Sequence, residues 1–224
     1  MHSWPLYCET GHPWLFMAEP VNTITNGFII LAAVMAFLQV RRARVGWPLD
    51  LSILLFLLLA TGIGSFFWHA FRTRMALAFD ALPGLLFLFV FAGFWICRLF
   101  GVWAGILGAL GLVAASSGSI WLTMTLFPQM RHLPPAISLA PAYATISAIG
   151  IGLIVLTIRK IGWNAARIAA GALTCAIIAA ICRSIDLMAC SAIPFGTHFL
   201  WHILLSLAAY LGIVFLLRFR TGGR

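Results

Sequence analysis

The sequence predicts an all-α polytopic membrane protein, a bundle of seven transmembrane helices. The chain of 224 residues is 63% hydrophobic and only 8% charged, whereas soluble domains carry about 25% charged residues. Its apolar residues form runs that are long enough, at about 1.5 Å per residue, to cross a hydrocarbon core of about 30 Å. The connections between the runs are too short for a soluble domain. We therefore expect one membrane domain covering residues 1–224.

Residues 1–19 are expected to form an extramembrane tail. The tail lacks the basic and apolar pattern of a cleavable signal peptide, so the first apolar run should serve as both insertion signal and permanent span. The spans are expected at 20–40, 49–70, 79–99, 102–126, 135–158, 165–183 and 197–217.

Basic or turn-forming residues follow each expected span. In chain order these separators are RRARVGWP, FRTRMALAF, Gly101, PQMRHLPP, RKIGWN, RSIDLMACSAIPFG and a basic tail. The weakest boundary is Gly101, where the third and fourth spans nearly merge.

The distribution of basic residues predicts an orientation with the N-terminus outside and the C-terminus inside. In that orientation ten lysines and arginines fall at inner helix ends and four at outer ends, out of fourteen, which agrees with the positive-inside rule. The net charge of +9 is therefore no sign of nucleic-acid binding. Arginine far outnumbers lysine and the loops are minimal, which favours a bacterial inner-membrane protein with its outer side in the periplasm. An organelle lumen remains the alternative.

The rare polar residues gather on the predicted outer side. Ser65 and His69 end the second span, Asp80 begins the third, and His198 and His202 begin the seventh. Because an ionisable group within hydrocarbon costs about 2.5 kcal/mol or more, this gathering from distant segments indicates a functional site.

Histidine spacing on the last span suggests a metal site. His198 and His202 are spaced i, i+4, so their imidazoles leave one helix face about 6 Å apart. This spacing suits two ligands of one ion, although interfacial histidines reaching toward water would look the same. His69 adds a third imidazole from the same side, and three imidazoles plus water make an open zinc site. A haem fits this pattern poorly, because its two ligands must face each other across the haem plane, whereas His198 and His202 lie on one face of one helix. The remaining histidines are expected bystanders: His2, His12 and His132.

Two further residues offer catalytic groups. Ser65 lies one turn before His69; its hydroxyl could bond the Thr61 carbonyl or assist at the water or developing oxyanion. Asp80 could simply pair with Arg72 and Arg74 at the membrane edge, or serve as the general base. We predict that Ser65 and Asp80 are catalytic.

The tail holds two acids and a cysteine. Glu9 and Glu19 suit a hard cation such as calcium, although Glu19 followed by proline is also a good helix start. Cys8 and Cys190 both lie in outer segments, where an oxidising compartment would permit a disulfide. Such a bond would join the tail to the loop before the last span.

Three blocks together resemble the signature blocks of alkaline ceramidases, which are seven-helix zinc amidohydrolases distantly related to the adiponectin receptors. The blocks read CE…EPVNTITN, GIGSFFWHAF…FDALP and RSIDLMAC…THFLWHILLSLAAY, and the resemblance covers nearly the whole chain. It implies that three histidines bind zinc, that Asp80 transfers protons and that Ser65 assists at the water or oxyanion. The implied zinc ligands are His69, His198 and His202.

The resemblance also implies a calcium site in the tail. Its ligands would be Glu9, Glu19 and the Tyr7 carbonyl. The family's aspartate before the CE pair and asparagine after it are absent, since these neighbourhoods read PL and TG here, which predicts a weaker site. The family also has cysteines at the positions of Cys8 and Cys190.

The expected function is zinc-dependent hydrolysis of the N-acyl bond of a ceramide-like membrane lipid, giving a long-chain base and a fatty acid. Zn²⁺ is the expected cofactor and Ca²⁺ a second one; no nucleic-acid or protein partner is predicted. Two alternatives remain. One is a related hydrolase acting on another acyl lipid. The other is a non-catalytic, receptor-like seven-helix protein with structural zinc.

Overall fold

The computed structural model describes residues 6–10 and 16–221, and all structural statements refer to these ranges. Within them the fold is helical, without strands. Seven helical segments are long and apolar enough to cross a membrane. This confirms the predicted all-α, seven-helix class and indicates a multi-pass membrane protein. The orientation in the membrane stays a prediction.

The first span is built from two consecutive helices and the other six from one helix each. The spans are α1 (Pro20–Thr25) with α2 (Gly27–Arg42), α3 (Leu49–Phe71), α4 (Arg74–Phe100), α5 (Val102–Leu126), α7 (Ala140–Lys160), α8 (Trp163–Ser184) and α10 (His198–Arg220). The connections contain the short elements η1 (Pro128–His132), α6 (Pro135–Ser138) and α9 (Asp186–Ala189).

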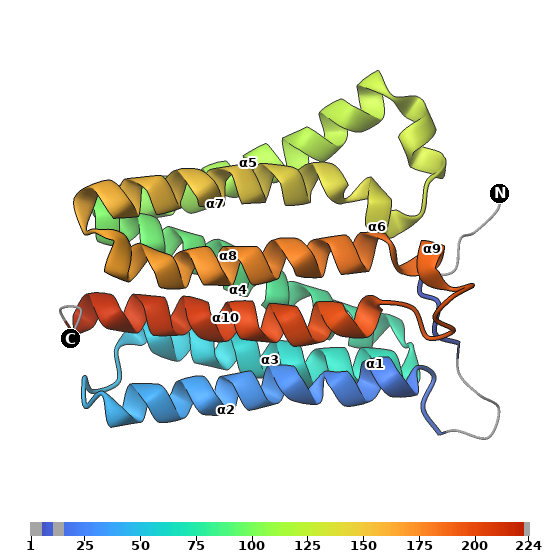
Figure 1. Ribbon diagram of the computed structural model, residues 1–224, viewed down its shortest axis with the longest axis horizontal. Helices are drawn as coiled ribbons and strands as arrows, with labels where there is room; N and C mark the ends of the chain where they lie inside the picture. Colours follow the sequence, from blue (N-terminus) through green and yellow to red (C-terminus); the bar gives the residue numbers. More distant parts are fainter. Residues whose placement is uncertain (1–5, 11–15, 222–224) are drawn as a thin grey trace.

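The long helices run side by side along the longest axis of the molecule (Figure 1). α1 and α10 begin at the end of the bundle that carries tail residues 6–10, which we call the tail end. α10 finishes at the opposite end, which we call the C-terminal end. At the tail end α5 leans away from the other helices, and η1 and α6 lead back to α7 (Figure 1).

The centre of the bundle lies among the first, second and last spans. The most apolar windows of these spans are 44–50% buried, against 17–22% for α4, α5, α7 and α8. Fully buried side chains such as Leu54, Ile213 and Phe215 form the core. Large apolar side chains on the outside, such as Trp103 at 78% exposure, are expected where a surface meets lipid.

The largest departures from the expected helix starts are at α4 and α7, while α8 and α10 begin within two residues of the expected positions. α4 begins at Arg74 rather than 79, because the Thr73 hydroxyl accepts a hydrogen bond from the Ala76 N–H and caps the helix. Asp80 therefore lies in the second turn of α4. The fifth span begins at Ala140 rather than 135. Pro135 starts the separate short helix α6, and Pro141, which has no N–H to continue that helix, lies in the first turn of α7.

A buried carboxylate connects three helices at the C-terminal end. Asp50, in the first turn of α3, pairs with Arg98 of α4 and with Arg220 of α10, the latter at 2.8 Å. A buried charge is tolerated when it is paired and hydrogen-bonded. Asp50 therefore has a structural explanation that does not involve the tail end.

Candidate metal centre

Three histidines meet at the tail end of the bundle. His69 comes from the last turn of α3, and His198 and His202 come from the first turns of α10. Their ligand nitrogens all lie within 4.8 Å of one another, and each side chain is at most 2% exposed. Within the described residues, this trio is the group of ligand-type side chains that converges in this way.

Two of the imidazoles are oriented by hydrogen bonds at Nδ1. His69 Nδ1 lies 2.5 Å from Glu19 Oε2, and His202 Nδ1 lies 3.0 Å from the Thr25 hydroxyl. Because that hydroxyl donates its own proton to the Val21 carbonyl, its oxygen accepts from His202. Protons at both Nδ1 atoms leave the Nε2 lone pairs free, which is the usual arrangement of metal-binding histidines.

The third imidazole is held by an aromatic ring. The ring of Tyr7 stacks on His198 with 4.1 Å between centroids, and His198 Nδ1 is buried without a hydrogen-bond partner. An orphaned buried nitrogen is costly, and a bound cation would satisfy it. Three neutral imidazoles fit a catalytic zinc ion in number and chemistry, since such an ion takes three protein ligands and a water.

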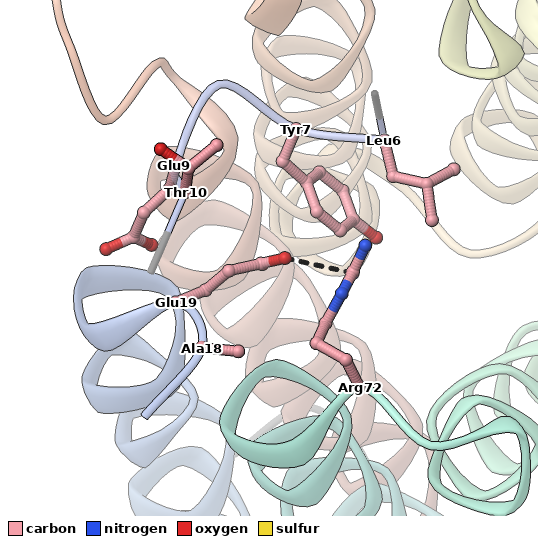
Figure 2. Close-up of a pocket in the computed structure, with 7 residues that line it drawn as sticks. All are labelled: Leu6, Tyr7, Glu9, Thr10, Ala18, Glu19 and Arg72. Carbon is pink, nitrogen blue, oxygen red and sulfur yellow. Dashed lines mark ion pairs between the residues drawn. The ribbon is translucent and has the colours of Figure 1, made fainter. Parts of the chain in front are cut away.

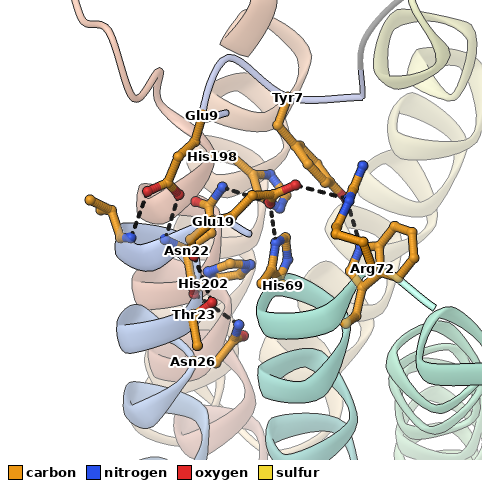
Figure 3. Close-up of polar contacts among 12 residues, drawn as sticks. Tyr7, Glu9, Glu19, Asn22, Thr23, Asn26, His69, Arg72, His198 and His202 are labelled. Carbon is orange, nitrogen blue, oxygen red and sulfur yellow. Dashed lines mark hydrogen bonds and ion pairs between the residues drawn. The ribbon is translucent and has the colours of Figure 1, made fainter. Parts of the chain in front are cut away.

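Glu19 connects the start of the first span to this trio (Figure 3). Besides His69, its carboxylate contacts Arg72 Nη1 at 2.9 Å and accepts a hydrogen bond from the Asn22 amide at 3.2 Å. Burial raises the pKa of Glu19 to about 7, against the opposing influence of Arg72 and Asn22. The sequence suggested a calcium ligand or a helix start for this residue; the structure places its carboxylate behind a candidate zinc ligand.

Glu9 caps the first helix from the tail. Its two oxygens accept hydrogen bonds from the backbone N–H groups of Val21 at 2.6 Å and Asn22 at 2.8 Å. Burial raises the pKa of the Glu9 carboxyl, and the two backbone bonds oppose this. Glu9, Glu19 and Tyr7 line one pocket of about 260 Å³ (Figure 2). The structure therefore gathers the three expected calcium ligands, and calcium binding stays a prediction.

Ser65 and Asp80 lie together between α3 and α4. The Ser65 side chain is 2% exposed and hydrogen-bonds the Asp80 carboxyl group. Gly64 makes this contact possible, because a Cβ there would collide with the backbone of Phe79 and Asp80. Asp80 is not one of the converging ligand groups, which suits a base better than a metal ligand.

The start of α10 is fixed by Asp186. Its carboxylate accepts hydrogen bonds from the N–H groups of Cys8, Thr197 and His198 at 2.7 to 2.9 Å. Cys8 is joined to Cys190 by a disulfide with 5.3 Å between Cα atoms. The tail, α9 and the first turn of α10 are thereby held together, which positions His198.

Several contributors were not found by sequence reasoning. Thr25 and the Tyr7 ring give no signal beyond their presence near apolar runs, and Asp186 gives none beyond the scarcity of acids in this chain. Among the expected bystanders, His132 lies in η1, apart from the trio. His2 and His12 lie outside the described residues, as does part of the PL and TG neighbourhoods.

Seven apolar helices and a buried three-histidine cluster at one end define a membrane protein with a candidate metal centre. The ceramidase family model matches residues 3–223, nearly the whole chain. The chain therefore belongs to the ceramidase family, whose name implies an amide hydrolase with a ceramide lipid substrate. A search of curated proteins found no match.

Proposed function

We propose that this protein is a zinc-dependent amidohydrolase that cleaves the N-acyl bond of a ceramide-like lipid within the membrane. One observation carries the proposal: three buried imidazoles converge within 4.8 Å in a chain of the ceramidase family. A zinc ion held by these imidazoles would polarise the amide carbonyl and make water acidic enough to attack it near neutral pH.

The chain's own residues prepare this site before any substrate arrives. Glu19 and Thr25 hold protons at Nδ1 of His69 and His202, so that the opposite nitrogens face inward. Hydrogen-bonded partners of this kind fix ring orientation and raise ligand basicity. Glu19, offered above as a calcium ligand, acts in this proposal as a positioning residue for His69.

Asp80 is the proton carrier in this proposal. Its carboxylate takes a proton from water as the water oxygen attacks the acyl carbon. It then gives the proton to the amide nitrogen, because an amide anion is a very poor leaving group. Ser65, hydrogen-bonded to Asp80, keeps the carboxyl group in one orientation. Water is consumed, the C–N bond breaks, and a fatty acid and a long-chain base are formed.

Access from the bilayer is supported by an apolar groove beside Gly64. The groove has a volume of about 590 Å³ and is lined by side chains of α3 and of the start of α4, including Phe67 and Phe79. Asp80 does not line the groove, but its neighbour Phe79 does, so an acyl chain lying in this groove would run along the turn of α4 that carries the proton carrier.

We also propose that the tail end faces the periplasm of a bacterial cell, because ten of the fourteen basic residues would then lie at inner helix ends. Alkaline phosphatase and green fluorescent protein, each fused to the C-terminus, test this orientation. An inactive phosphatase together with a fluorescent protein supports a C-terminus inside, and the reverse pattern contradicts it.

The function is tested by metal analysis of the purified protein, followed by incubation with a panel of N-acyl and ester lipids. We expect about one zinc per chain, as for a mononuclear site, and release of fatty acid from ceramide. Release from another lipid alone would point to a related hydrolase. Tightly held zinc without release from any lipid would support the receptor-like alternative and contradict the proposal. Calcium in the same analysis would support the tail site.

A further inference from the structure

Arg183 lies at the tail end of α8, surrounded by aromatic side chains. Its guanidinium carbon is 5.2 Å from the ring centroid of Trp201 and 5.9 Å from that of Tyr7. The hydroxyls of Tyr7 and Tyr143 both hydrogen-bond its side chain. We call Tyr7, Tyr143 and Trp201 the Arg183 cage. The cage joins the tail, α7 and α10 around one cation and holds the guanidinium in place.

This cation has no carboxylate partner among the residues that the structure describes. Arg72 pairs with Glu19, and Arg98 and Arg220 share Asp50, whereas within residues 6–10 and 16–221 no ion pair of 4.0 Å or less involves Arg183. Its Nε is moreover buried without a hydrogen-bond partner. A guanidinium nitrogen that is buried without a partner is costly, above all in a membrane protein. Such a group is the expected signature of a site for an anionic ligand.

The Arg183 cage borders the candidate metal centre. The Tyr7 ring contacts both sites: it lies beside Arg183 and stacks on His198 with 4.1 Å between ring centroids. Trp201 directly precedes His202 on α10. Arg183 also interacts electrostatically with Asp80 and with the histidines of the trio. A ligand bound at the metal centre therefore comes within the field of Arg183.

We propose that Arg183 binds the carboxylate of a fatty acid, the acyl product of the reaction. This inference rests on the proposed function, since hydrolysis converts a neutral amide into that anion. A guanidinium carries five N–H donors in a planar fork. With two tyrosine hydroxyls as partners, donors including Nε–H remain, and arginine pairs with carboxylates more strongly than with neutral groups. Arg183 thus favours the product acid over the neutral amide and makes the acid an inhibitor.

A binding comparison with matched chains tests this inference without any need for hydrolysis. Palmitate and hexadecanol compete with a fluorescent fatty acid for the purified wild-type protein in detergent, at alkaline pH where the acid is ionised. We expect palmitate to bind at least about tenfold more tightly than hexadecanol, as for a charge-assisted bond. Arg183→Gln should abolish this preference and Arg183→Lys should keep part of it.

Two further variants serve as a control for the loss of an arginine and as a substitute if Arg183→Gln does not fold. Arg167→Gln, an exposed arginine near the other end of the same helix, should keep the full preference. If Arg183→Gln does not fold, Tyr143→Phe removes one hydroxyl that holds the guanidinium and should reduce the preference several-fold. Thermal unfolding and metal content confirm that each variant is intact.

The outcomes separate this inference from the proposed function. Equal affinity of the wild type for palmitate and hexadecanol, or an unchanged preference in intact Arg183→Gln, overturns the role of Arg183. If ceramide is hydrolysed in that case, the proposed function stands without it. A preference that depends on Arg183 in a protein that hydrolyses no lipid would keep the carboxylate site and overturn its assignment to a product.

Discussion

The two ends of the bundle both bury charged side chains, but only the C-terminal end satisfies them completely. There Asp50 has two arginine partners, and the three side chains connect α3, α4 and α10. At the tail end, by contrast, His198 Nδ1, Arg183 Nε and the side-chain oxygens of Asn22 and Asn26 are buried without partners.

This difference suggests that the charged side chains of the C-terminal end stabilise the fold, whereas those of the tail end serve function. A paired carboxylate completes its interactions within the fold, as at the C-terminal end. Buried polar groups without partners are costly, and where they persist a water, an ion, a ligand or a catalytic role accounts for them. All four such atoms named above belong to the tail end, where the candidate metal centre and the Arg183 cage lie. We expect substitutions at the tail end to change metal binding and chemistry, and those at the C-terminal end to change stability.

The largest effect is expected from loss of a histidine. His69→Ala or His202→Ala removes one of three imidazoles, so bound zinc and lipid hydrolysis should both fall at least about a hundredfold. Zinc per chain and fatty-acid release measure this. His132→Ala is the control and should leave both unchanged. Full activity in a zinc-free His202→Ala protein would rule out the mechanism.

Asp80→Asn should separate chemistry from metal binding. The amide side chain keeps the shape of the carboxyl group but cannot carry a proton, so the rate should fall about 10²- to 10⁴-fold. Zinc content should be unchanged, since Asp80 is not among the converging ligands. Single-turnover hydrolysis with metal analysis of the same sample gives both values. An unchanged rate would remove Asp80 from the mechanism.

Glu19→Gln and Glu9→Gln form a matched pair at the tail end. Glu19 contacts His69, so its loss should weaken zinc affinity about 10- to 100-fold. Glu9 caps α1 through two backbone N–H groups, so its loss should lower stability by about 1 kcal/mol and leave zinc affinity unchanged. Zinc titration against a chelator compares them. Equal zinc affinities in the two variants would contradict the assignment of Glu19 to His69.

The smallest functional effect is expected at the C-terminal end. Asp50→Asn leaves two arginines without their carboxylate, so stability should fall by about 1 to 3 kcal/mol. This is less than the full cost of breaking a buried pair, because both arginines are partly exposed. Thermal unfolding in detergent measures it. The hydrolysis rate per folded molecule should stay at the wild-type value. A large fall in that rate would contradict the assignment of the C-terminal end to stability alone.

Much of the architecture could be predicted because polar residues are scarce in this chain. Apolar runs define the seven helices, and a histidine at a helix end is conspicuous when few other polar groups surround it. The spacing of His198 and His202 already placed two imidazoles on one face. The start of α4 was harder to predict, because it depends on the cap formed by Thr73.

The partners of these residues could not be predicted from the sequence. Glu19 meets His69 across 50 residues of chain, and Thr25 meets His202 across 177. Such contacts depend on which faces of α1, α3 and α10 approach each other. The glutamates illustrate this: carboxylate chemistry alone suggested calcium or a cap, and only the fold directs one toward a helix N-terminus and the other toward an imidazole.

The most direct test of a catalytic zinc centre is the return of activity to metal-free protein. The purified wild type is stripped with a chelator, checked by metal analysis and titrated with zinc, while fatty-acid release from ceramide is followed. We predict no hydrolysis without metal and a rate that rises with zinc until about one ion is bound per chain. Hydrolysis by the fully stripped protein, or none after one zinc per chain is restored to folded protein, would contradict a catalytic zinc centre at the three histidines.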